Sequence, residues 1–278
     1  MKLSNIAQEI RELIKVRQQS LGLTFEEDKH IYTMNGRKDY PSVSSVIKKF
    51  YKPFPTEEAA YNKAGGDPER QQQLIEEWAA AGDYSTNLGS RVHYMLEKFL
   101  IEKNGNYKEV RQPVFECDLS QLMKSDNMIF AGKRYLELME SRNVELLDTE
   151  MVLGDPELGY TGQPDKIWLT YNKTGDDFGL LVTDWKTNKK KNFEETKFTD
   201  RMYTPFEKYP NTALGHYLVQ LPLYAKLLIK MLEGTKYENI KVYGCIISHL
   251  KDDTFFEEYR VPKDIIDIVL DMDIKKYL

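Results

Sequence analysis

The apolar residues in the first half of the chain recur at the spacing of amphipathic helices. Ile6, Ile10 and Ile14 are four positions apart, which predicts a first helix over about 3 to 20. A hairpin is expected next, with strands over 23–26 and 30–34 and a turn at 35–36. Four further helices are predicted in this half, over about 41–50, 67–82, 86–103 and 119–142.

One of these helices has sequence signals at both ends. Pro68 directly after Asp67 is typical of a helix start, and Gly82 is expected to end the helix. Thr86 or Asn87 is then expected to open the next helix, because small polar residues favour that position.

From about residue 145 the spacing changes to the alternation that is typical of strands. Three strands are predicted over 145–153, 163–171 and 178–186. A helix over 211–233, two strands over 240–248 and 254–261, and a C-terminal helix should follow. This order favours an α/β or α+β fold, with a mixed central sheet flanked by helices and a helical N-terminal portion.

Two of the predicted strands carry charged residues at the end of an apolar face. Asp165 shares a face with Ile167, and Asp184 and Lys186 share one with Val182. A hairpin that is symmetric about its polar turn places Asp165 opposite Asp184, with Cβ atoms about 4.5–5.5 Å apart.

Two neighbouring carboxylates at the edge of a core repel each other and are costly to desolvate. A divalent cation between them resolves this conflict, and oxygen ligands suit Mg²⁺ or Mn²⁺. Lys186 could then stabilise negative charge on a phosphate or orient the attacking water. The same residues also fit an ordinary strand rim with surface acids and a solvated lysine.

Two helices add candidate polar pairs. His93 and Glu97 lie four residues apart on one helix face, and both could reach a metal or its water. Gln220 and Tyr224 have the same spacing on the helix over 211–233 and could hold a phosphate, a base or the lysine. The alternatives, which involve no chemistry, are a His–Glu pair on the helix surface and a tyrosine packed in the core.

Composition limits the classes of function. The chain has 39 basic and 44 acidic residues and a net charge of −5, which argues against coating nucleic acid by charge alone. Its two cysteines, Cys117 and Cys245, suggest neither a disulfide scaffold nor a four-thiolate site. With no apolar run of membrane length and no apolar leader, we expect a cytoplasmic protein, in a host cytoplasm if viral.

Taken together, these motifs resemble the PD-(D/E)-x-K nuclease superfamily, in its RecB-like exonuclease branch. The matching motifs are Gly89-Ser90-Arg91-Val92-His93 with Glu97, Pro164-Asp165, Asp184-Trp185-Lys186-Thr187, and Gln220 to Tyr224. Glu150 stands where many relatives carry a glutamate. More loosely, His30-Ile31-Tyr32 and Tyr40-Pro41-Ser42-Val43 resemble small phage exonucleases and mitochondrial genome maintenance exonucleases.

The resemblance implies a restriction-endonuclease-like core over 85–278. The region 1–84 would pack on it and help to form a DNA channel. The implied ligands of one or two Mg²⁺ or Mn²⁺ ions are His93, Asp165, Asp184 and the backbone carbonyl of Trp185. The implied catalytic residues are Asp165, Asp184, Lys186, Glu97, Gln220 and Tyr224. An iron–sulfur cluster is not expected, because the cysteines are too few.

Contacts with DNA are expected from clustered cations and rings. Lys189, Lys190 and Lys191 follow the strand that carries Lys186 and could track phosphates. Tyr203 and Phe206 could stack unpaired bases, as could their aromatic neighbours Phe50, Tyr51, Phe54 and Tyr209. A solvated loop and packed core rings are the alternatives.

The resulting expectation is an exonuclease on DNA ends, acting on single strands in recombination, repair or replication. A structure-selective endonuclease on the same core and a non-catalytic DNA-binding subunit are the alternatives. Partners would be DNA and a separate recombinase, single-strand-binding protein or helicase, since the chain has no phosphate-binding Gly-x-x-x-x-Gly-Lys loop of its own. No membrane partner is expected.

Overall fold

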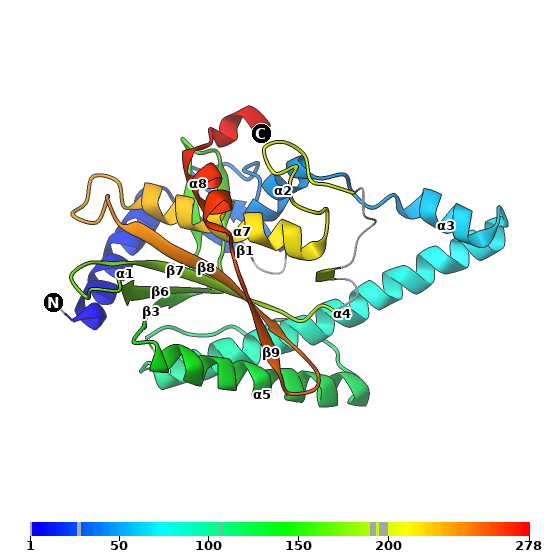
Figure 1. Ribbon diagram of the computed structural model, residues 1–278, viewed down its shortest axis with the longest axis horizontal. Helices are drawn as coiled ribbons and strands as arrows, with labels where there is room; N and C mark the ends of the chain where they lie inside the picture. Colours follow the sequence, from blue (N-terminus) through cyan, green and yellow to red (C-terminus); the bar gives the residue numbers. More distant parts are fainter. Residues whose placement is uncertain (1, 27–28, 106, 190–192, 195–199) are drawn as a thin grey trace.

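A five-stranded mixed sheet lies at the centre of the described part of the chain (Figure 1). The structure is a computed structural model that describes residues 2–26, 29–105, 107–189, 193–194 and 200–278. The strands, in spatial order, are β3 (Glu145–Thr149), β6 (Lys166–Tyr171), β7 (Phe178–Lys186), β8 (Lys241–Leu250) and β9 (Phe256–Arg260). The pair β7–β8 is parallel and the other pairs are antiparallel, so the expected mixed sheet is confirmed.

The parallel pair needs a crossover connection, and helix α7 (Ala213–Met231) supplies it. Thr212 caps α7 by accepting a hydrogen bond from the Gly215 N–H at 3.0 Å. Gly234, with a φ of +76°, allows the chain to turn back after the helix. The predicted helix and its end are therefore confirmed to within a few residues.

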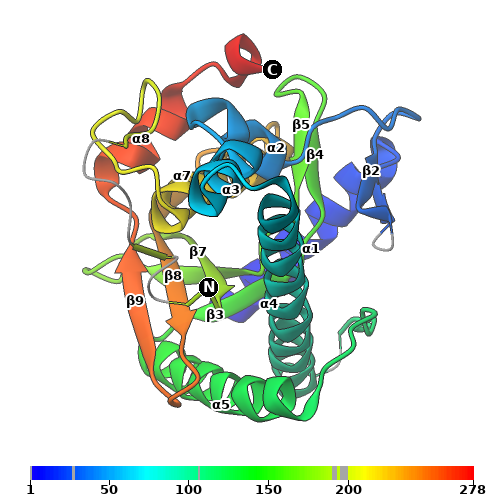
Figure 2. The same cartoon turned by 90° about the vertical axis from the view of Figure 1, so that its right-hand side faces the viewer.

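Helices cover both faces of the sheet (Figures 1 and 2). On one face, α4 (Pro68–Lys103) and α5 (Leu119–Ser141) pack against Trp168, Leu181 and Trp185. On the other face, α1 (Leu3–Ser20), α7 and α8 (Lys263–Asp271) pack against the sheet, and α2 (Val43–Ile47) packs on α7. Ile167 and Val182 belong to the buried cluster on this face. The predicted helix over 3–20 coincides with α1. Of the helices in the described ranges, none has the length and apolar content that would be needed to span a bilayer.

Smaller elements complete the fold. Two hairpins pair β1 (Thr24–Glu26) with β2 (Ile31–Thr33) and β4 (Leu153–Asp155) with β5 (Tyr160–Gly162). The remaining elements are η2 (Lys48–Phe50), α3 (Thr56–Ala64) and η3 (Ile274–Tyr277). The predicted strand over 145–153 is thus divided between β3 and β4, and α3 was not predicted.

The expected helix end at Gly82 is wrong, because α4 runs without a break from Pro68 to Lys103. Asp67 caps the start of α4 as expected, by accepting from the Glu69 N–H at 2.9 Å. Gly82 does not adopt the left-handed conformation that ends helices, and the Ser85 hydroxyl donates within the helix to Ala81 O. The expected boundary at residue 84 therefore falls inside one helix, whose outer half projects beside α3 (Figure 1).

Candidate metal centre

The register of the β6–β7 hairpin agrees with the sequence prediction. Lys166 pairs with Thr183 and Ile167 with Val182, so one further step places Asp165 beside Asp184. The backbone N–H of Trp185 donates to Asp165 Oδ2 at 2.7 Å. The apolar residues of the same face, which follow Asp165 on β6 and precede Asp184 on β7, belong to one buried cluster, as expected.

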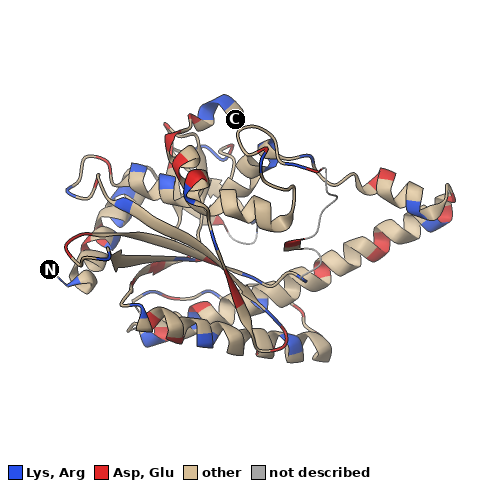
Figure 3. Cartoon of the chain, viewed as in Figure 1, with Lys and Arg blue, Asp and Glu red and all other residues tan. Residues whose placement is uncertain are grey.

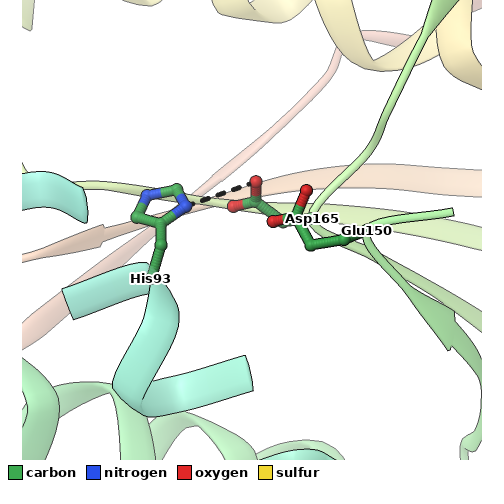
Figure 4. Close-up of side chains that lie close together, drawn as sticks. All are labelled: His93, Glu150 and Asp165. Carbon is green, nitrogen blue, oxygen red and sulfur yellow. Dashed lines mark ion pairs between the residues drawn. The ribbon is translucent and has the colours of Figure 1, made fainter. Parts of the chain in front are cut away.

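Glu150 and His93 join Asp165 in a compact group of possible ligands (Figure 4). One ligand atom from each of the three residues lies within 4.8 Å of the other two. His93 Nδ1 is 3.4 Å from Asp165 Oδ1. Glu150 follows β3 with a φ of +41°, and this bend is held by its N–H donating to Asp165 O at 3.1 Å and by Gln163 donating to its carbonyl at 2.9 Å.

Burial makes it costly for the carboxyl groups of this site to be charged together. Burial raises the pKa of Glu150 well above its usual value, and the charges of Asp165 and Glu97 add to the shift. Burial and the neighbouring Asp165 raise the pKa of Asp184 to about 7. A histidine nitrogen and clustered carboxylate oxygens form a donor set that fits Mg²⁺ or Mn²⁺, and a bound cation would offset this cost.

Asp165 is the carboxylate that the site keeps ionised. Burial opposes its charge, but His93, Lys166 and Lys186 outweigh that effect and hold the pKa of Asp165 well below its usual value. Lys186 Nζ is 2.9 Å from Asp184 Oδ1 and 4.2 Å from the centroid of the Tyr217 ring. Burial opposes the charge of Lys186 too, yet the two aspartates and Tyr217 raise its pKa.

Lys166 is a site residue that the sequence reasoning missed. Its side chain is fully buried, and its Nζ lies 3.9 Å from Asp165 Oδ2 and 3.2 Å from the centroid of the Trp185 ring. Burial lowers the pKa of Lys166 to about 7 despite the nearby carboxylates. A signal was present, because Lys166 occupies an inward position of an otherwise apolar strand, directly after Asp165.

Glu97 faces the centre from α4, one turn after His93. The Thr149 hydroxyl donates to Glu97 Oε1 at 3.0 Å, and Lys108 Nζ is 3.5 Å from the same oxygen. Burial raises the pKa of Glu97. Its contacts fit a residue that supports the centre rather than one of the three clustered ligands. Gly89 sits against Thr187, where a Cβ atom would be 3.3 Å from the Thr187 hydroxyl.

Helix α7 brings Gln220, Tyr224 and Tyr217 to the site from the other face. Gln220 Nε2 donates to the Tyr224 hydroxyl at 2.9 Å, and both side chains are buried. Burial and the charge of Asp184 raise the pKa of Tyr224. Tyr217, which the sequence reasoning missed, is the ring that packs under Lys186. The expected metal contact of the Trp185 carbonyl stays a prediction.

Two cavities adjoin the centre, and His93 lines both. The larger, of about 540 Å³, also exposes Glu97, Glu150 and Tyr224. The smaller, of about 250 Å³, is lined by Lys186, Lys189 and Tyr217 among others. His93 is therefore shared by two spaces that could take substrate, and Glu150 faces the larger one.

The residues expected to bind DNA have different outcomes. Lys189 lines the smaller cavity, whereas Lys190 and Lys191 lie outside the described residues. Tyr203 is 49% exposed and remains available for stacking. The expectation for Phe206 is wrong, because this ring is fully buried and packs edge-on against Phe50, also fully buried, at 5.1 Å.

Comparison with known proteins adds no relatives to this picture. A scan of the chain against models of protein families finds no match, and a search of curated proteins finds none either. The case for a function therefore rests on the residues of the site and on the motifs they form.

Proposed function

We propose that the protein is a metal-dependent deoxyribonuclease that hydrolyses phosphodiester bonds from DNA ends. The observation that carries this proposal is the placement of Asp165, Asp184 and Lys186 at one end of a two-strand hairpin. That placement agrees with the motif resemblance described above, and His93 and Glu150 stand beside it. The mixed sheet with helices on both faces is compatible with a restriction-endonuclease-like fold, which is part of the proposal.

His93, Glu150 and Asp165 would hold a divalent cation, with Asp184 next to them. When bound, such a cation lowers the pKa of water and neutralises charge on a phosphate. The Trp185 N–H fixes one oxygen of Asp165, which leaves the other directed toward His93.

Lys186 would contribute a fixed positive charge to the substrate phosphate. Its ammonium group is held between the Asp184 carboxylate and the Tyr217 ring, so its position is set before substrate arrives. Preorganised charge of this kind stabilises the negative charge that develops on phosphate oxygens during hydrolysis.

Single-stranded DNA is the substrate that the surroundings of the site favour. The net charge is negative, and basic and acidic positions are interspersed along the helices (Figure 3), so binding would depend on local cations such as Lys186 and Lys189. Both lysines line the smaller cavity, which shares His93 with the larger one. A strand that passes from one cavity to the other would cross the candidate ligands.

The test is digestion of end-labelled single- and double-stranded oligonucleotides with Mg²⁺, with Mn²⁺ or with EDTA. We expect shortening from one end that requires the metal and stops with EDTA. A covalently closed plasmid should remain intact, whereas its cleavage would favour an endonuclease. Absence of metal-dependent cleavage on every substrate would refute the proposal and favour a DNA-binding role.

A further inference from the structure

The larger cavity has an aromatic wall as well as candidate metal ligands in its lining. Phe25, His30 and Tyr32 form this wall, and all three come from the β1–β2 hairpin. His93 and Glu150 line the same cavity. Its volume of about 540 Å³ falls in the range of roughly 300–1,000 Å³ that is typical of small-molecule sites.

The three rings of this wall differ in burial, from the buried Tyr32 through Phe25 to the exposed His30. Phe25 pairs with Tyr32 across the hairpin, and their rings stack with centroids 4.4 Å apart at 30°. Tyr32 is only 6% exposed and supports Phe25 from behind, whereas Phe25 is half-buried. His30 is exposed and meets Phe25 edge-on at 5.2 Å. Phe25 therefore presents a ring that is fixed in place but still reachable.

The wall and the metal centre are close enough to influence each other. Burial raises the pKa of Tyr32, and the charge of Glu150 adds to this effect. Lys108 and Arg111 also line the cavity, and Lys108 is held in place by Glu97 at 3.5 Å and Asp148 at 3.3 Å. The cavity thus combines a ring surface with cationic groups, which are the features that a base and a phosphate require.

We propose that this cavity binds the terminal nucleotide of the DNA strand, with its base stacked on Phe25 and its phosphodiester at the metal centre. This proposal rests on the proposed function. It identifies the terminal base as the group that the site recognises next to the bond it cleaves. Stacking on a ring is tolerant of sequence, so the cavity would accept any of the four bases.

The test measures binding of a labelled single-stranded oligonucleotide in EDTA, where no cleavage takes place. Wild type and Phe25→Ala are each compared on an oligonucleotide with natural ends and on versions with an abasic 5′ or 3′ terminal residue. We expect Phe25→Ala to weaken binding of the natural strand about tenfold. Removing the base at one of the two ends should weaken binding to the wild type by a similar factor. Combining that base removal with Phe25→Ala should weaken binding little further.

The inference would be overturned if the losses of affinity from Phe25→Ala and from base removal multiplied, as independent effects do. It would also be overturned if Phe25→Ala left binding of the natural strand unchanged. Phe255→Ala is the matched control, because Phe255 is 58% exposed on the β8–β9 turn and does not line the cavity. Phe25→Trp should retain the preference for a terminal base. If Phe25→Ala fails to fold, Phe25→Leu takes its place in the binding test, because leucine removes the ring but keeps apolar bulk. The same outcomes are expected for it.

The outcomes separate this inference from the proposed function. A non-additive result without metal-dependent cleavage would leave a terminal-nucleotide binding site and refute the nuclease. If cleavage is metal-dependent but Phe25→Ala and removal of the terminal base weaken binding independently, the nuclease proposal stands and the stacking site is refuted.

Discussion

Lys166 Nζ lies 3.2 Å from the centroid of the Trp185 ring, with its whole side chain buried below the Asp165 carboxylate. In the described part of the chain, this ammonium group has no hydrogen-bond acceptor within reach and is 3.9 Å from Asp165 Oδ2. A buried amine without a bonded partner is costly for folding. The Trp185 ring and the nearby carboxylates offset part of this cost, so Lys166 should matter more for function than for stability.

Lys166→Met should change the free energy of unfolding by no more than about 1 kcal/mol, because the desolvation cost that is removed with the buried amine offsets the lost attraction to Asp165. The same variant should reduce cleavage by roughly 10- to 100-fold, since Asp165 loses a neighbouring cation that favours its ionised form. Chemical denaturation and cleavage assays check the two effects. A large loss of stability would contradict the first expectation.

Lys186→Ala should reduce the cleavage rate by roughly 100- to 1,000-fold, because it removes a preorganised positive charge from the site. Lys241→Ala is the matched control. Lys241 lies on β8, is 67% exposed and pairs with Asp177 at 2.7 Å on the surface. Cleavage rates of both variants, measured at saturating metal, check this prediction. Equal rates would remove Lys186 from the mechanism.

Gly162→Ala should destabilise the fold by about 1–3 kcal/mol, because a Cβ atom there would lie 2.7 Å from both Tyr224 Cε1 and Val43 Cγ2. Gly82→Ala provides the contrast. A Cβ atom at Gly82 meets nothing within 4 Å, and alanine favours the helix by about 1 kcal/mol, so this change should stabilise. Thermal unfolding of both variants tests this prediction. Equal shifts of the unfolding midpoint temperature in the two variants would contradict it.

His216 should make the protein less stable as the pH falls from 6.5 to 4. Burial lowers its pKa to about 4, and its ring stacks on Tyr51 with centroids 3.6 Å apart. In that interval the unfolded chain binds a proton at His216 and the folded chain does not, so the free energy of unfolding decreases.

Denaturation at pH 5 and pH 7 tests this expectation. The difference in unfolding free energy between the two pH values should shrink in His216→Gln. The control is His30→Gln, which changes an exposed histidine and should leave the difference as it is in the wild type. An unchanged difference in His216→Gln would contradict the prediction.

The elements and pairings that depend on local patterns could be predicted from the sequence. The Asp165–Asp184 register followed from a hairpin that is symmetric about a polar turn, and the structure has that register. Gly82 misled the prediction, because a glycine ends a helix only where the backbone turns left-handed, and here it does not. Local signals give the type of an element more reliably than its end.

Contacts between distant segments could not be predicted in the same way. Phe206 is buried by Phe50, more than 150 positions away in the chain, so its sequence neighbours do not reveal its exposure. Tyr217 under Lys186 and Lys108 beside Glu97 likewise come from separate elements. The motifs named the charged residues of the site, but the groups that hold them in place emerge only from tertiary packing.

Helix α4 has 36 residues and, at about 1.5 Å per residue, is about 54 Å long. Its outer half lies against α3, and its inner half carries both His93 and Glu97. Because no break separates the two halves, one continuous helix links the segment beside α3 to the residues of the candidate centre. A change in the tilt of the outer half would therefore be carried along the same backbone to the imidazole of His93.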